Sequence, residues 1–357
     1  MRRTTLVAVG DIAFSERIER YFKRASYDYP FKGVKSFLSS GDLIFGNLES
    51  PITDASIKNE SHYSKLTDDP ILGKRVYLKS SSWTVKSLKA AGFNVLSIAN
   101  NHILDYGCRG LRDTIEALTK AGILHVGAGL NLSLSRRPAI FTLGQRKIGF
   151  LAYSYTYEAT KNSCGCTPLW RFIVKQDVKS LRDKVDIVVV SCHYGKEFSF
   201  TPSKFQRSIS HFAIDCGADI VLGHHPHVIQ PIEIYKGKII MYSLGNFLFD
   251  YNLYGIPLPE DLLFHTRLSV IVKITIHGDN DLTYDLLPIY LDENFQLKPV
   301  LNRHKISLTD LNSKSVSCSS IRKTALLFRL IFLSLIKGNK LNLLLLASRA
   351  LNECGLL

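Results

Sequence analysis

The sequence of 357 residues lacks a hydrophobic run long enough to cross a membrane. The two apolar runs near its end, at 325–336 and 341–347, are far shorter than the ~20 residues that a membrane-spanning helix needs. Lys337 and Lys340 lie between them. We therefore expect residues 301–357 to form a helical extension that packs on the domain or on a partner, with an interfacial membrane helix as the alternative.

No signal peptide and no cysteine framework are recognisable in the sequence, so we expect neither. Residues 1–5 lead directly into the strand-like run at 6–9, which leaves no room for the apolar segment of a signal peptide. Seven cysteines are an odd number, and Cys164 and Cys166 are separated by one residue, not by the two of a usual redox or zinc pair. The sequence therefore predicts reduced intracellular thiols.

No aromatic-rich basic stripe accompanies the positive charge of the chain. The formal net charge is +14 and the isoelectric point is near 9.4, but Lys and Arg are scattered in short groups such as Arg136-Arg137. A basic balance is compatible with nucleic acid, an anionic membrane or an acidic polymer, and does not choose among them. Because no base-recognition module is visible, we do not expect a nucleic acid as partner and favour an ordinary solvated surface.

Apolar runs of strand length alternate with segments of helical period, which is typical of an α/β domain. Strands are expected at 6–9, 43–45, 95–99, 148–152, 187–191, 220–222 and 239–242. Helices are expected at 83–91, 109–121 and 203–216, each followed by a glycine that suits the left-handed closing residue. Two longer strands, at 268–276 and 282–291, flank a polar turn and predict a hairpin. We expect one domain over residues 1–300.

Polar side chains gather where the predicted strands end. In open α/β sheets, groups at the carboxyl ends of strands lie along one edge, so clusters far apart in sequence can converge there. Carboxylate, asparagine oxygen and imidazole are the expected ligands of divalent Mn, Fe or Zn, and no cysteine belongs to any cluster. Each cluster alone has an ordinary explanation as a turn or a helix cap. Five clusters together predict a metal site, and they are Gly10-Asp11, Asn47-Leu48-Glu49, Asn100-Asn101-His102, His193 and Gly223-His224-His225-Pro226-His227.

These clusters, together with His193-Tyr194-Gly195-Lys196-Glu197 and Tyr242-Ser243-Leu244-Gly245-Asn246-Phe247, resemble the CapA family of capsule-synthesis proteins over residues 4–250. That family is associated with bacterial poly-γ-glutamate capsule synthesis and belongs to the calcineurin-like metallophosphoesterases. The resemblance implies a four-layer α/β/β/α sandwich with a site for two divalent metal ions at one edge. It implies metal-ligand roles for Asp11, Glu49, Asn101, His193, His225 and His227, with His224 as a competing ligand.

The resemblance also implies that His102 donates a proton to the leaving group. Asp105 either orients the His102 imidazole or caps the next helix. Glu197, four residues after His193, could hold a ligand histidine in place, and Asn246 lies either at the rim of the pocket or in a tight turn. Where the wider superfamily has a histidine, two residues after the first Asp, this sequence has Ala13, which predicts one tight and one weak metal position.

Two functions of different class follow from this resemblance. In the first, the protein hydrolyses a phosphoester or related bond in capsule or envelope polymer metabolism, and His102 favours this enzyme. In the second, it binds metal and an acidic polymer without hydrolysis as part of a synthesis or export complex, a reading that Ala13 favours. Both have an anionic partner, a phosphoester or an acidic polymer. Because the chain starts at the first strand, we expect a cytoplasmic protein, with peripheral contact to the inner membrane or a synthesis complex as the alternative.

Overall fold

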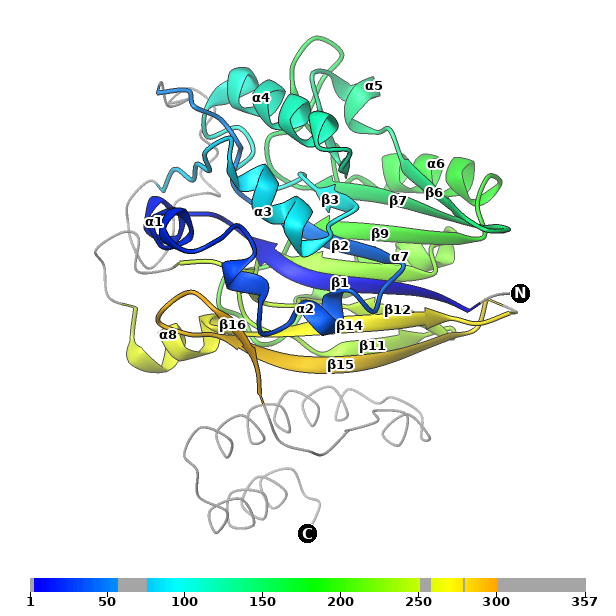
Figure 1. The fold of residues 1–357 in the computed structure, drawn as a ribbon. Coiled ribbons are helices and arrows are strands. Elements are labelled where there is room, and N and C mark those ends of the chain that lie inside the picture. The colour runs from blue at the N-terminus through cyan, green and yellow to red at the C-terminus, as the bar shows by residue number, and fades with distance from the viewer. Residues whose placement is uncertain (1–2, 57–75, 251–257, 279, 301–357) are drawn as a thin grey trace, which may run out of the picture.

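A computed structural model of the protein describes residues 3–56, 76–250, 258–278 and 280–300 (Figure 1). The extension predicted at 301–357 lies outside the described residues. Within them the chain forms an eight-stranded sheet, a six-stranded sheet and a two-stranded sheet. The first four strands of the eight-stranded sheet in chain order run parallel to one another, and so do four strands of the six-stranded sheet. The carboxyl ends of each parallel set therefore lie along one edge of their sheet.

The eight-stranded sheet has the order β16-β15-β14-β1-β2-β3-β4, and β13 pairs with β1. Its antiparallel hairpin, β14 to β15, has the bounds that the sequence predicts, with Ile276 opposite Leu282 next to the turn. Its strands are β1 (Thr4–Ile12), β2 (Leu43–Leu48), β3 (Val95–Ser97), β4 (Leu124–Val126), β13 (Asn246–Leu248), β14 (Leu268–Ile276), β15 (Leu282–Leu291) and β16 (Leu297–Pro299).

The six-stranded sheet has the order β11-β12-β10-β9-β7-β6. Its strands are β6 (Ala139–Leu143), β7 (Arg146–Ser154), β9 (Ile187–His193), β10 (Ile220–His224), β11 (Ile232–Tyr235) and β12 (Lys238–Met241). The short strands β5 (Ala128–Gly129) and β8 (Gly165–Cys166) form the two-stranded sheet. The strands predicted at 148–152, 187–191, 220–222 and 239–242 are all present in the six-stranded sheet.

The two large sheets bury apolar side chains against each other. The rings of Phe45 on β2 and Phe150 on β7 stack at a centroid distance of 5.7 Å, and Val189 of β9 joins the same core. Because successive side chains of a strand point to opposite faces, Val188 and Val190 join a second core. The apolar run 187–190 of β9 is therefore buried on both faces, which is typical of a parallel strand inside a layered α/β fold.

Helices cover the outer faces of the two sheets and complete four layers (Figure 1). Leu88 of α3 and Leu111 of α4 pack into the core of the first sheet, whereas Val178 of α6 and Ile209 of α7 pack on the second. The helices are α1 (Glu16–Arg24), η1 (Tyr29–Phe31), α2 (Lys35–Leu38), α3 (Thr84–Ala91), α4 (Gly107–Lys120), α5 (Leu132–Ser135), α6 (Arg171–Arg182), α7 (Lys204–Asp215) and α8 (Glu260–Thr266). The predicted α/β/β/α sandwich is confirmed.

The helix ends follow the capping rules that the sequence suggested. Ser203 caps α7 through a complete capping box with Gln206. Gly92, Gly122 and Gly217 have positive φ angles after α3, α4 and α7, so the three predicted helices are confirmed, with ends shifted by up to two residues. In the described part of the chain, no helix is long and apolar enough to span a membrane.

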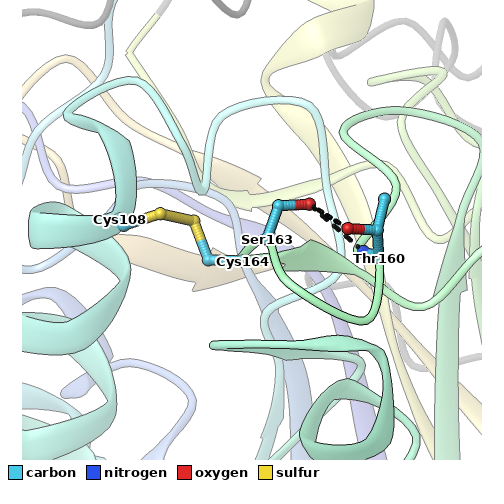
Figure 2. Close-up of a disulfide and its surroundings, with 4 residues drawn as sticks. All are labelled: Cys108, Thr160, Ser163 and Cys164. Carbon is cyan, nitrogen blue, oxygen red and sulfur yellow. Dashed lines mark hydrogen bonds between the residues drawn. A yellow bond between two sulfur atoms is a disulfide. The ribbon is translucent and has the colours of Figure 1, made fainter.

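Cys108 and Cys164 form a disulfide, and the prediction of reduced thiols was wrong for this pair. The bond joins the first turn of α4 to the loop before β8, with the two Cα atoms 5.9 Å apart (Figure 2). The partners are 56 residues apart in sequence, so neither the cysteine count nor the spacing of Cys164 and Cys166 could reveal the pairing. Among the described residues, Cys166, Cys192 and Cys216 are free thiols.

Replacing both Cys108 and Cys164 by serine should lower the free energy of unfolding by about 3 to 4 kcal/mol, because the cross-link restricts a 56-residue loop in the unfolded chain. Urea unfolding of the double variant and the wild type, each without reductant, measures the difference. Replacing Cys216, a half-buried free thiol, by serine is the matched control, since it keeps the cross-link. Equal midpoints for wild type and double variant would show that the disulfide does not form in solution.

Candidate metal centre

The polar clusters predicted from strand ends meet at one edge of the two sheets. In the first sheet, Asp11 pairs in register with Asn47 of β2 and with Asn246 of β13. In the second, His193 at the end of β9 pairs with His224 at the end of β10. Asp11 and the histidines of the second sheet touch across the interface, since Nδ1 of His224 lies 3.0 Å from a carboxylate oxygen of Asp11. The predicted convergence is therefore observed.

Three overlapping trios of side chains place their donor atoms within 4.8 Å of one another. Glu49 belongs to two trios, His225 to two and His227 to two, so neighbouring trios share ligands. Shared ligands are what a centre for more than one ion requires. The trios are Glu49 with His193 and His225, Asp11 with Glu49 and His227, and Glu197 with His225 and His227.

Asp11 is fully buried and held as an anion. Its carboxylate accepts hydrogen bonds from the side-chain amide of Asn47, from Nδ1 of His224 and from the backbone amide of His225. Burial alone raises the pKa of Asp11. The hydrogen bond and charge of His224, with the charge of His227 and the hydrogen bond from Asn47, outweigh it and hold the pKa below the ordinary value.

Close backbone contact fixes the position of Asp11. Its amide donates to the carbonyl of Gly245 at 3.0 Å, where β1 meets the turn before β13. A Cβ atom on Gly10 would collide with the same carbonyl oxygen, so the neighbouring position accepts only glycine without movement of the backbone. Gly245 itself has φ of 73°. The Gly-Asp signal in the sequence therefore has a structural cause in addition to the carboxylate.

The Glu49 carboxylate is buried, and neither of its oxygens has a hydrogen-bond partner within the part of the chain that the structure describes. Its Oε1 lies 3.7 Å from Nε2 of His193 and 3.6 Å from Nε2 of His227. Burial raises the pKa of Glu49 well above the usual range, and the charges of Asp11 and Glu197 raise it further. A buried carboxylate without a partner is costly, and a bound cation facing the same histidines removes this cost. The donor set therefore fits divalent metal ions.

Two histidines of the trios, His193 and His225, have lowered pKa values that favour the neutral form, which is the form that binds metal. Burial first, and then the charge of His227, lowers the pKa of His225 to about 3. Burial and the neighbouring imidazoles also lower the pKa of His193 well below its usual value. Nε2 of His193 lies 2.7 Å from the side-chain oxygen of Asn101, so this predicted pair of ligands is in direct contact. Protons therefore do not compete for these imidazoles near neutral pH.

The structure gives different surroundings to the adjacent histidines His224 and His225. His224 ends β10, belongs to no trio among the described residues and hydrogen bonds to Asp11. His225 belongs to two trios, and each of the two histidines keeps one buried ring nitrogen without a partner among the described residues, Nε2 in His224 and Nδ1 in His225. His225 and His227 have φ angles of 95° and 58°, a left-handed backbone that is rare for residues other than glycine. This turn directs His225 and His227 to the trios, and we assign His224 to the orientation of Asp11.

His102 lies beside the trios and is oriented by Asp105. Nδ1 of His102 is 2.8 Å from a carboxylate oxygen of Asp105, which also accepts the backbone amide of Leu78 at 2.6 Å. The helix α4 begins at Gly107 without a side-chain cap, so the orienting role of Asp105 is the one observed. His102 belongs to no trio in the described part of the chain. Its imidazole is therefore held by Asp105 and lies outside the trios that the described residues form.

Two asparagines support the site in ways that the sequence did not show. Asn47 donates to Asp11 at 2.9 Å and contacts Nδ1 of His193 at 3.4 Å, so it links the two sheets. The side-chain oxygen of Asn246 accepts a hydrogen bond from Nδ1 of His227, and its amide group donates to the carbonyl of Thr266. This arrangement fixes His227 with Nε2 toward Glu49. The predicted rim or turn role for Asn246 missed this contact, and only its position after β12 was a signal.

Comparison with known proteins identifies the family. Residues 5–251 match the family described as bacterial capsule synthesis protein PGA_cap. The chain belongs to this family. The PGA_cap protein is 31% identical over 306 residues to the capsule biosynthesis protein CapA of Bacillus anthracis, covering 84% of this chain and 70% of that protein. It is 32% identical over 294 residues to the PGA biosynthesis protein CapA of Bacillus subtilis, covering 80% of this chain and 71% of that protein.

The fold of the PGA_cap protein is similar to that of a solved phosphatase from Mycoplasma pneumoniae. The two structures match with a TM-score of 0.50 and 16% sequence identity, over 81% of this chain and 94% of the other. At this identity the likeness shows a common fold and no more. The predicted α/β/β/α sandwich and the predicted CapA-type family are thus both confirmed, and the clusters that carried the prediction form the candidate metal centre.

Proposed function

We propose that this PGA_cap protein is a metal-dependent hydrolase of a phosphoester or related bond in the synthesis of a bacterial capsule or poly-γ-glutamate polymer. The single observation that carries the proposal is the buried Glu49 carboxylate, which lacks a hydrogen-bond partner and lies among histidines of both neighbouring trios. A site that only stabilised the fold would satisfy this carboxylate with a donor from the protein.

We propose two divalent ions, Mn, Fe or Zn, in this centre. Asp11, Glu49, Asn101, His193, His225 and His227 would hold them, with Glu49 shared because it belongs to two trios. Bound metals of this kind lower the pKa of a water molecule and neutralise the charge of a phosphoryl group. With Asp11 and Glu49 as anionic ligands, two divalent ions leave a net positive site, which suits an anionic substrate.

The residues of the chain have separate tasks in this proposal. Asn47 and His224 orient the Asp11 carboxylate, and Asn246 orients His227. His102 provides a proton for the leaving group from its other ring nitrogen, Nε2, while Asp105 fixes the ring through Nδ1. His102 and Asp105 are 8% and 5% exposed, so little water reaches their hydrogen bond and the ring keeps its direction.

The binding function remains the second candidate because of Ala13. This residue, two positions after Asp11, is buried in an apolar cluster and offers no ligand atom. In that case the protein would bind metal and an acidic polymer as part of a synthesis or export complex, with an anionic partner in either case. Contact with a membrane or a complex through residues 301–357 is a further proposal on residues that the structure does not describe.

We also propose that the domain works in an oxidising compartment rather than in the cytoplasm that the sequence predicted. The disulfide between Cys108 and Cys164 supports this location, since such bonds persist mainly outside reducing compartments. Peptide mapping of the natively expressed protein without reductant detects the linked pair. A reduced pair in native material would instead support the cytoplasm.

Elemental analysis of the purified protein, combined with assays on aryl phosphomonoesters and phosphodiesters, tests the hydrolase. We expect near-stoichiometric divalent metal and turnover of at least one ester with added Mn²⁺, because the trios present neutral imidazoles and carboxylates to the ion. Chelator-treated protein is the control and should lose turnover until metal is returned. Bound metal without cleavage of either ester would favour the binding function, and protein that takes up no metal would refute the assignment of the centre.

A further inference from the structure

Glu197 approaches the metal centre from the loop after β9. One of its carboxylate oxygens lies within 4.8 Å of donor atoms of both His225 and His227, and these two histidines also belong to the other trios. Glu197 is half-buried, whereas Asp11, Glu49 and the histidines are buried, so it lies on the solvent side of the centre. A second observation points to a ligand at the histidines that Glu197 approaches, because Nδ1 of His225 is buried without a hydrogen-bond partner among the described residues.

The loop that presents Glu197 is fixed at both ends by hydrogen bonds, from the half-buried Tyr155 at one end and the buried Gln230 at the other. Before Glu197, the hydroxyl of Tyr155 donates to the carbonyl of Gly195 at 3.1 Å. After it, the side-chain amide of Gln230 donates to the carbonyl of Ser199 at 2.6 Å and accepts from Gln206 at 2.9 Å. Because this loop is already ordered, placing the Glu197 carboxylate in a binding position costs little further conformational entropy. Such ordering is expected for a residue that binds a ligand and not for one that only faces solvent.

The loop is also anchored next to Glu197 itself. The backbone amide of Phe198 donates to the carbonyl of Pro226, between His225 and His227. Phe198 has a φ of 58°, and its ring packs on the apolar cluster that contains Ala13. The side of the centre at Ala13 therefore has apolar side chains and no ligand atom in the described residues, while the neighbouring loop brings in a carboxylate.

We propose that Glu197 is a metal ligand which, with His225 and His227, completes the solvent-facing metal position of this centre. The inference rests on the metal binding in the proposed function. It adds the Glu197 carboxylate as a ligand, because Ala13 offers no ligand atom. A third anionic ligand lowers the net charge of a two-ion site from +2 to +1. The alternative is that Glu197 only holds a ligand histidine in position, as the sequence suggested.

Calorimetric titration of metal-free protein with Mn²⁺ separates these roles. We expect two equivalents for the wild type and, for Glu197→Gln, one equivalent of unchanged affinity and a second weakened at least ~100-fold, since the amide is a poor substitute for an anionic ligand. The electron paramagnetic resonance signal of two coupled Mn²⁺ ions should be lost in Glu197→Gln and kept in Glu197→Asp. Lys196→Gln, a change of the exposed neighbouring residue, is the matched control and should keep both equivalents and the coupled signal.

The outcomes distinguish this inference from the proposed hydrolase. Two equivalents of unchanged affinity and an unchanged coupled signal in Glu197→Gln would overturn it, as would a wild type that binds a single ion. Wild type that binds two ions in a Glu197-dependent way but cleaves no ester would support the ligand and refute the hydrolase. Equal melting temperatures of the metal-free proteins show that the variants fold, so a lost equivalent reports on the site.

Discussion

Replacing Glu49 by glutamine should stabilise the metal-free protein and abolish its stabilisation by metal. The Glu49 carboxylate is buried with no hydrogen-bond partner on either oxygen, so without metal its charge is a cost to the folded state. Removing that charge should raise the free energy of unfolding of the metal-free protein at neutral pH by about 2 kcal/mol. Metal at a thousand times its dissociation constant stabilises the wild type by about 4 kcal/mol, and this gain should vanish in the variant because Glu49 belongs to two trios.

The pH dependence of the metal-free protein follows from the same group. Burial raises the pKa of Glu49 well above its unfolded value, so the folded state favours the protonated carboxyl. The resulting stability is fully present below the unfolded pKa of about 4.3 and is lost as the pH rises through the raised folded pKa. Chemical unfolding from pH 4 upward should therefore show a decline in wild type that Glu49→Gln lacks.

The matched control for this prediction is Glu233→Gln. Glu233 is also largely buried but accepts hydrogen bonds from Tyr242 and His211, so losing its charge should destabilise the protein and leave metal binding unchanged. Thermal unfolding with chelator and with Mn²⁺ gives both quantities for each variant. A metal-free Glu49→Gln protein that is less stable than wild type, or one that metal still stabilises, would show that Glu49 has a structural partner and no metal.

The parts of the fold that the sequence predicts are those set by long local patterns. The hairpin of β14 and β15 alternates over nine and ten residues around a polar turn, and its bounds were predicted without error. The strands β3 and β12 are short but were predicted from apolar runs, whereas the equally short strands β4, β6, β11, β13 and β16 were missed. Their pairing is decided by neighbouring strands of the sheets, which the local sequence does not encode.

The candidate site likewise has parts that the local sequence predicts and parts that it does not. Strand ends could be recognised locally, and the parallel topology then placed Asp11, Glu49 and His193 at one edge. The choice between His224 and His225 depends on the left-handed backbone at His225, and the disulfide of Cys108 depends on a loop that passes α4. Both are tertiary effects. The ligand types were therefore readable from the chain, while their orientation required the structure.

Replacing His102 by glutamine should lower turnover by about 10² to 10⁴ while the protein keeps its metal. His102 belongs to no trio, yet its charge acts on His193 and His225, so it is close to the centre without being part of it. Its Nδ1 is engaged by Asp105, which leaves the other nitrogen for a proton that the leaving group needs. Metal content and kcat measured on the same preparation separate a lost acid from a lost ligand.

The identity of the leaving group tests this role more sharply than the size of the loss. A general acid matters most when the departing oxygen is strongly basic, so His102→Gln should impair an alkyl phosphoester far more than an activated aryl ester whose leaving group departs without a proton. His277→Gln, a histidine of the β14 to β15 turn that contacts Thr283, is the matched control and should affect neither substrate. Equal losses of turnover on the two esters would show that His102 positions the centre and does not donate a proton to the leaving group.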